Sequence, residues 1–308
     1  MIFKLILKLI NPVEWVRAYR FHRKTKAFDK SEFDLELYFY SKVLKNDMLH
    51  YGYFDDPDVT PNNISLQQLE DAQVRYSRKI MEKIADREGT VLDVGCGMGG
   101  LSGLLLSENY KVEALTPNRN QKEYIKHKHP DLTLHHCKFE DLKTDKTYGT
   151  IINSESLQYI KLDQAFDRID QLLVENGRWI VVDYFQVEKK EDDRPPHLLE
   201  KFLAKVKERN WEITAEEDIS RNALPTIRMG FMIAERFLLP VKHFAYEKLR
   251  FKRAWLYYFT RDIRTFIDEK ADKELATIDP ERFMKERRYM FYVITKQTLS
   301  QGEPSVGP

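Results

Sequence analysis

A short apolar strand that runs straight into a glycine-rich turn is the strongest structural signal in this chain. Residues 91–94 read Val-Leu-Asp-Val, and Gly95, Gly97 and Gly100 follow in the spacing of a dinucleotide fingerprint. Glycine lets the backbone of such a turn approach a ligand closely. Asp93, however, lies two residues before the first glycine, where a carboxylate would repel a pyrophosphate. The turn therefore suits a ligand that carries a positively charged amino group.

The sequence on both sides of this turn alternates between strand and helix patterns. Apolar spacing predicts a helix over 66–85, and further helices are expected over 100–108, 120–128, 163–175 and 197–208. Strands are expected over 90–94, 110–115, 132–136, 148–153, 178–185, 211–219 and 287–295. This alternation predicts an α/β fold, a parallel sheet with helices on both faces.

The pattern divides the chain into five parts. We expect an N-terminal helical cap over 1–65, a ligand-binding core over 66–220, a helical insertion over 221–284, a last core strand over 285–298 and a loose tail over 299–308.

Composition excludes several classes of protein. Of the 308 residues 42% are apolar and the net charge is +1, values that a disordered chain does not have. The sequence contains no run of 18 apolar residues, so a membrane-spanning helix is not expected. Its two cysteines, Cys96 and Cys137, can form neither a disulfide framework nor a Cys-rich zinc site. We therefore expect a cytoplasmic protein without a metal centre.

The near-neutral net charge conceals two basic segments. Residues 1–26 hold seven Lys or Arg against one Glu, and residues 221–264 hold ten against three acidic residues. In the first segment apolar residues from Ile2 to Ile10 cover one broad helical face. This arrangement suits a helix that lies in the interface of an anionic membrane and attaches the protein to it peripherally. A helix docked on the domain, or a solvated basic face, is the alternative.

The strand and turn at 91–99 resemble the first motif of the class I (Rossmann-like) methyltransferases, h-L-D-h-G-x-G-x-G, throughout. The resemblance implies that the cofactor is S-adenosyl-L-methionine. It also implies that Gly95 and Gly97 form the wall against the methionine part and that Asp93 orients this part. That fold places its ligands at the carboxyl ends of the strands.

Later segments match this family with departures. The usual acidic residue at the end of the second strand is absent, which leaves Glu113, Thr116 and Asn118 as candidates for the ribose contact. The resemblance implies that Phe139 packs on the adenine and that Glu140, or Asp141 beside it, accepts from the adenine amino group. Asn153, at the end of the fourth strand, is expected at the same ligand-binding edge.

Two further segments resemble the tocopherol, sterol and cyclopropane-fatty-acid branch of these enzymes: His50-Tyr51-Gly52-Tyr53, and an Ala-Gln pair that ends at Gln73. The branch implies that Tyr51 and Tyr53 fold over the cofactor and that Gln73 contacts it. Core packing is the alternative for the two tyrosines. Cyclopropane synthases of this branch use a cysteine near the N-terminus. This sequence has no cysteine before Cys96, so methylation is preferred to cyclopropanation.

Methyl transfer needs alignment, exclusion of water and, for many acceptors, a general base. Glu155 is the first candidate base and His50 the second, and either could be structural.

The aromatic, basic insertion over 221–284 favours a lipid-like or other lipophilic small-molecule acceptor, although a helical lid that packs on its own aromatic residues would have the same sequence pattern. No nucleic-acid partner is expected, but an RNA or protein acceptor and a non-catalytic scaffold remain alternatives. Carbon, nitrogen and oxygen acceptors are all compatible with the sequence, and it leaves the oligomeric state open.

Overall fold

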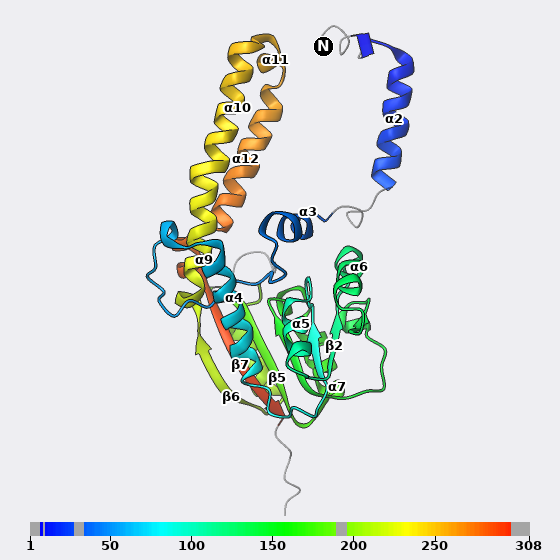
Figure 1. Cartoon of the computed structure of the whole chain (residues 1–308), viewed down its shortest axis with the longest axis vertical. Helices are drawn as coiled ribbons and strands as arrows, with labels where there is room; N and C mark the ends of the chain where they lie inside the picture. Colours follow the sequence, from blue (N-terminus) through cyan, green and yellow to red (C-terminus); the bar gives the residue numbers. More distant parts are fainter. Residues whose placement is uncertain (1–6, 9, 28–33, 189–195, 297–308) are drawn as a thin grey trace, which may run out of the picture.

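The computed structural model describes residues 7–8, 10–27, 34–188 and 196–296. Its core is a seven-stranded sheet with the strand order β3-β2-β1-β4-β5-β7-β6 (Figure 1). The strands are β1 (Val91–Val94), β2 (Val112–Leu115), β3 (Thr133–His135), β4 (Tyr148–Ser154), β5 (Leu173–Gln186), β6 (Trp211–Asp218) and β7 (Arg287–Lys296). The α/β fold expected from the alternating pattern is confirmed.

The direction of the last strand differs from the expectation of a parallel sheet. The first five strands run parallel, but β7 lies between β5 and β6 and runs antiparallel to both. Six successive residues of β7, from Tyr289 to Ile294, are buried. A strand covered on both faces must lie inside the sheet, but a hydrophobic run does not reveal its partners or its direction. The prediction was therefore right about the strand and wrong about its orientation.

Helices cover both faces of the sheet. One face packs on α7 (Leu162–Leu172) and α8 (Leu199–Glu208), through Phe166 and Phe202 against Trp179. The other face packs on α4 (Leu66–Met81), α5 (Gly100–Ser107), α6 (Arg119–Lys128), α9 (Ser220–Ile233) and α13 (Pro280–Glu286). Alternate residues of β1 enter the two cores, Leu92 the first and Val91 the second. Asp93 shares the face of Val91 and therefore points toward α5.

The helix α4 fixes the segment that precedes it. Ser65 accepts from the backbone N–H of Gln68, whose side chain accepts from the N–H of Ser65, so the helix begins with a capping box. Its apolar stripe then buries Tyr76 and Ile80 against the sheet. This packing holds one face of α4 beneath residues 45–54, which we call the strap.

Several helices extend beyond the core on the side of the carboxyl ends of the parallel strands (Figure 1). They are α2 (Pro12–Ala27), α3 (Leu35–Tyr38), η2 (Phe39–Leu44), η6 (Ala234–Leu238), α10 (Leu239–Lys252), α11 (Ala254–Phe259) and α12 (Arg261–Thr277). Among the described helices, none combines the length and apolarity needed to cross a bilayer. Most of the helix expected over Ile2–Ile10, and the tail expected over 299–308, lie outside the described residues.

Candidate active site

A cavity of about 600 Å³ opens at the carboxyl ends of β1, β2 and β4. Its walls come from the strap, from the turns that follow these three strands and from η4 (Phe139–Asp141). A cavity of this size is typical of small-molecule sites. It is lined by ten residues predicted from the sequence: His50, Tyr51, Asp93, Gly95, Gly97, Thr116, Asn118, Phe139, Glu140 and Glu155.

The turn after β1 needs its glycines for conformation and for space. Gly95 has φ +74° and Gly97 has φ +56°, values that side-chain-bearing residues rarely adopt. A Cβ on Gly95 would lie 2.5 Å from the Cβ of Ser156, and one on Gly97 would lie 3.0 Å from Cδ1 of Leu49. The turn is thus held between the loop after β4 and the strap, with its backbone at the cavity wall.

Asp93 supplies a buried carboxylate beside this turn. Its side chain is 2% exposed, and Ser102 Oγ on α5 donates to its Oδ2 over 2.5 Å. Burial raises the pKa of Asp93 to about 6, although the bond from Ser102 acts in the opposite direction. A cationic ligand group in the cavity would stabilise the ionised form. The carboxylate therefore fits the amino group of a methionine moiety.

We expect the affinity for S-adenosylhomocysteine to fall as the pH drops through about 6, because protonated Asp93 cannot pair with an ammonium group. Above that pH the carboxylate is ionised and affinity is full, whereas well below it affinity drops about tenfold per pH unit. Calorimetric titration between pH 5 and 8 measures this. Ser102→Ala should move the midpoint upward, because its hydrogen bond holds the pKa down. A flat profile would contradict the role of Asp93.

The strap lies across the glycine turn and is fastened by Gln73 of α4. The Gln73 amide donates to the carbonyl oxygens of Met48 and His50, over 2.8 and 2.7 Å, and its Oε1 accepts from Asn46. Gln73 is 2% exposed and does not line the cavity. Its observed contacts are therefore to the strap, and it acts on the cavity through Met48 and His50.

The strap directs its two predicted tyrosines differently. Tyr51 lines the cavity, and its ring packs edge-on against Tyr289 at 5.9 Å. Tyr53 does not line the cavity; its hydroxyl donates to Glu217 at 3.2 Å, and Lys79 lies over its ring. Strict alternation along an extended segment would place Tyr51 and Tyr53 on the same side. The contacts with Glu217 and Lys79 instead hold Tyr53 outside the cavity.

His50 lines the cavity with both ring nitrogens already engaged. Nδ1 lies 2.8 Å from the carbonyl oxygen of Tyr51, and Nε2 lies 3.1 Å from Ser77 Oγ. The ring stacks on Tyr76 at 4.1 Å, and burial lowers the pKa of His50 to about 4. The imidazole is therefore neutral at pH 7, with Nδ1–H donating to the carbonyl and Nε2 accepting from the serine. These contacts suit a residue that orients the strap.

The turn after β2 presents amide and hydroxyl groups to the cavity. Thr116 Oγ1 donates to Gln121 Oε1 over 2.7 Å, and Asn118 caps α6 by accepting from the backbone N–H groups of residues 120 and 121. Gln121 lines the cavity but was missed in the sequence. It lies in the first turn of α6, directly after the strand end that the sequence already placed at the ligand edge, and that position could have revealed it.

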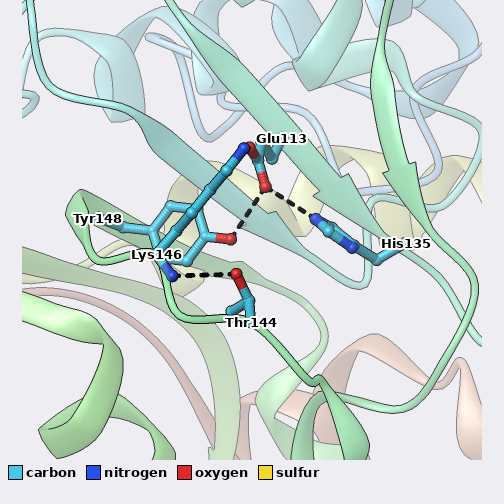
Figure 2. A network of polar contacts seen from close by, with 5 residues as sticks. All are labelled: Glu113, His135, Thr144, Lys146 and Tyr148. Atoms are coloured by element: carbon cyan, nitrogen blue, oxygen red, sulfur yellow. Dashed lines mark hydrogen bonds and ion pairs between the residues drawn. The ribbon is translucent and has the colours of Figure 1, made fainter.

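Glu113 of β2 does not line the cavity; its side chain lies in a separate network of polar contacts (Figure 2). Its carboxylate accepts from Lys146 Nζ at 2.5 Å and from the Tyr148 hydroxyl at 2.9 Å, and it pairs with His135 at 2.8 Å. Burial would raise the pKa of Glu113, but these hydrogen bonds outweigh it and hold the pKa below its ordinary value. Glu113 is therefore not a ribose candidate in this structure.

Glu113→Gln should lower the free energy of unfolding by about 2 kcal/mol at pH 7, because the network loses its charge. The native pKa is depressed, so this stabilisation exists above the unfolded-state pKa and is lost as the pH falls through the native value. Urea denaturation measures the change. Binding of S-adenosylhomocysteine to the folded variant should stay unchanged; a large loss would return Glu113 to the ligand site.

The far end of the cavity is formed by Glu155 and a group of tyrosines. Glu155 follows β4 with φ +51°, and its Oε1 accepts from the backbone N–H of Tyr51 at 2.8 Å and from the Tyr289 hydroxyl at 2.7 Å. Tyr40, Tyr159 and Tyr184 line the same end of the cavity. A carboxylate fixed by two donors thus faces an aromatic wall.

Asn153, just before this turn, supports the cavity from behind. It is fully buried, accepts from Trp179 Nε1 and donates to Ser156 Oγ, which in turn donates to the Val94 carbonyl oxygen. Asn153 does not line the cavity. Its bonds join the ends of β1 and β4 and so fix the position of the glycine turn.

The lining residues fit S-adenosylmethionine in chemistry and in size. A buried carboxylate, an open glycine backbone, hydroxyl and amide groups after β2, and Phe139 with Glu140 match its ammonium, methionine, ribose and adenine parts. In the described ranges no three His, Cys, Asp or Glu side chains are grouped to hold a metal ion.

Comparisons with known proteins agree with this geometry. An uncharacterized methyltransferase from Staphylococcus carnosus is 26% identical over 140 residues, which are 44% of this chain and 67% of that protein. A cyclopropane synthase from Mycobacterium tuberculosis has a TM-score of 0.59 at 13% identity, over 86% of this chain and 95% of its own. A geranyl diphosphate C-methyltransferase from Streptomyces coelicolor, solved with S-adenosyl-L-homocysteine, has a TM-score of 0.55 at 15% identity, over 80% and 87%.

The sequence profile of the mycolic acid cyclopropane synthetase family matches residues 21–206. This match includes the strap, the glycine turn, the four following strands β2 to β5 and Glu155. It confirms the branch expected from the sequence, and with it an enzyme that uses S-adenosylmethionine. The chain belongs to the mycolic acid cyclopropane synthetase family and is a class I methyltransferase of that branch.

Proposed function

We propose that this enzyme transfers a methyl group to a lipophilic small-molecule acceptor held beside Glu155. The observation that carries the proposal is the pair of donors on the Glu155 carboxylate, Tyr51 N–H and the Tyr289 hydroxyl, in the same cavity that Asp93 lines. A base fixed in this way is placed to take a proton from an acceptor. Tyr40 and Tyr184 add apolar surface for the acceptor's body.

Each part of the cofactor has a proposed set of partners. Asp93 orients the ammonium group, and Gly95 and Gly97 allow the backbone to lie against the methionine chain. Thr116 and Gln121 hold the ribose hydroxyls, and Asn118, whose amide caps α6 and donates to Asp34, positions them. Phe139 and Glu140 hold the adenine. When bound, S-adenosylmethionine supplies an activated methyl group and leaves as S-adenosylhomocysteine.

The residues of the protein orient the reacting groups and take up the proton that the acceptor loses. The strap covers the glycine turn and excludes water, which keeps the reacting groups in one geometry. The Glu155 carboxylate accepts the proton that the acceptor loses and returns it to solvent. Tyr53, Gln73, Asn153 and His50 act through position: they hold the strap and the turn after β4 in place.

Cyclopropanation of a lipid alkene is the second candidate, because the matching profile is that of a cyclopropane synthetase family. Methylation is preferred, since no cysteine precedes Cys96 in this sequence. No observation favours an RNA acceptor, a protein acceptor or a non-catalytic scaffold. A cytoplasmic setting, peripheral to an anionic membrane through the basic residues 1–26, remains part of the proposal.

Incubation with trideuteromethyl-labelled S-adenosylmethionine and a cell extract, followed by phase separation, tests both candidates. Methylation delivers all three deuterons to the product, whereas cyclopropanation delivers two. Label in the organic phase with three deuterons is the expected result. Two deuterons would select cyclopropanation, and label confined to the macromolecular fraction would contradict the small-molecule acceptor. Glu155→Gln is the matched control, because it keeps the two accepted hydrogen bonds but removes the charge.

A further inference from the structure

The helical hairpin formed by α10, α11 and α12 is the largest feature that the proposed reaction does not use. It extends away from the sheet on the side of the cavity (Figure 1). No described side chain of these three helices is buried, and none of them lines the cavity. At 1.5 Å per residue, α10 alone carries the tip about 20 Å from its base. The hairpin is therefore presented to something outside the domain.

The hairpin leaves large apolar side chains exposed on its surface. Between the helices, Lys242 Nζ pairs with Asp268 at 2.6 Å, and the Arg264 guanidinium stacks on Tyr257 at 3.4 Å. The leucines at 239, 249, 256 and 275 are partly buried. The exposed apolar side chains stand among charged ones; they are Phe237 on η6, Val241 and Phe244 on α10, and Ile263, Phe266 and Ile267 on α12. A surface helix that packs only on its own domain turns its apolar side chains inward, so these residues are available to an apolar surface outside the domain.

The tip combines exposed aromatic residues with positive charge. Phe251 is 81% exposed, Phe259 76%, Tyr258 69% and Trp255 44%. Residues 248–264 contain six Lys or Arg against Asp262 alone, whereas residues 265–277, nearer the core, contain four acidic residues against two lysines. Positive charge is thus concentrated at the end farthest from the sheet. The tip is complementary to an anionic surface.

We infer that this hairpin tip, residues 248–264, docks the enzyme on a bilayer with anionic headgroups. Aromatic side chains enter the interfacial region, and Lys248, Arg250, Lys252, Arg253 and Arg261 meet the headgroups. This inference rests on the peripheral membrane association proposed above and names a docking surface for it, but it does not depend on the methyl transfer. It places the carboxyl edge of the sheet, and with it the cavity mouth, on the membrane side.

The helix α2 supports the same orientation. It extends in the same direction as the hairpin (Figure 1), and Val13, Val16 and Tyr19 are exposed on it beside Arg17 and Arg20. Two segments far apart in the sequence therefore present apolar and basic side chains on one side of the molecule. A single planar surface can contact both.

Co-sedimentation of the full chain with vesicles tests the inference. Vesicles of neutral phosphatidylcholine are compared with vesicles that contain phosphatidylserine. Arg250→Glu with Lys252→Glu removes charge at the tip, and Phe251→Ser with Tyr258→Ser removes aromatic surface. Lys270→Glu with Lys273→Glu is the control, because it makes the same charge change near the base of α12. All six side chains are exposed, so each variant should fold and bind S-adenosylhomocysteine as the wild type does.

Each tip variant should lose about tenfold or more of its partitioning onto anionic vesicles, while the control changes much less. In a Trp15→Phe background, which removes the exposed tryptophan of α2, lipids with brominated chains should quench the tryptophan fluorescence more than they do after the further change Trp255→Phe. The two remaining tryptophans are inside the domain, because Trp179 is fully buried and Trp211 packs on Phe166. Equal binding to neutral vesicles, or unchanged binding of the tip variants, would overturn the inference. So would a solution dimer that the tip variants dissociate, or RNA binding that they abolish while vesicle binding persists.

Discussion

Asp93→Asn should weaken S-adenosylhomocysteine binding about a hundredfold at pH 8. The asparagine keeps the shape of the side chain and can still accept from Ser102, so only the charge is removed. A hydrogen bond to a charged group contributes about 1.5–3 kcal/mol, and the upper end of this range is a factor of about a hundred in affinity. Isothermal calorimetry measures the loss. Unchanged affinity would remove Asp93 from the cofactor site.

The same substitution should stabilise the unliganded enzyme, which separates lost binding from misfolding. The native pKa of Asp93, about 6, lies above the ordinary aspartate pKa of 3.8. The ionised carboxylate therefore destabilises the fold increasingly as the pH rises between these values, and fully above about 6, by at most about 3 kcal/mol. Urea denaturation at pH 8 should show Asp93→Asn at least as stable as wild type. A buried charge that lowers the stability of the folded protein is typical of a functional site.

Glu155→Gln should lower kcat about a thousandfold while S-adenosylhomocysteine affinity changes little. The glutamine oxygen can still accept from Tyr51 N–H and from the Tyr289 hydroxyl, so the turn after β4 keeps its geometry. The proton acceptor is lost, and general-base catalysis contributes about 10²–10⁴ in rate. Methyl transfer to the acceptor isolated from the organic phase measures kcat.

Two further variants distinguish the general base from residues that only hold it in position. Tyr289→Phe removes one donor to Glu155 and should lower kcat less than Glu155→Gln does. The His50 ring is neutral, and both of its nitrogens are hydrogen-bonded within the protein. His50→Gln should therefore lower the free energy of unfolding but leave the pH profile of kcat nearly unchanged. If His50→Gln lowers kcat more than Glu155→Gln does, the base is His50.

Local patterns in the sequence predicted most of the fold. The apolar spacing of the helix expected over 66–85, the strand before Gly95 and the helix expected over 163–175 are short-range signals, and they correspond to α4, β1 and α7. The placement of β7 between β5 and β6 depends on pairings between residues about a hundred positions apart. No periodicity encodes such partners.

The candidate site also has residues that a local motif predicts and residues whose contacts depend on the tertiary structure. Asp93, Gly95 and Gly97 follow from one contiguous motif and line the cavity together. Gln73 and Asn153 were expected to contact the cofactor, but their amide groups are bonded within the protein. The sequence shows that these amide side chains lie near the site. The direction in which each one points depends on which buried backbone and side-chain groups need a hydrogen-bond partner.

Titration of the wild-type chain with S-adenosylhomocysteine at pH 8 tests whether the cavity beside the glycine turn binds the cofactor. We expect saturable heat with one ligand per chain, and protection of the strap, residues 45–54, from amide hydrogen exchange in the complex. No heat from a chain that circular dichroism shows to be folded would contradict it, as would binding that leaves the strap and the glycine turn unprotected.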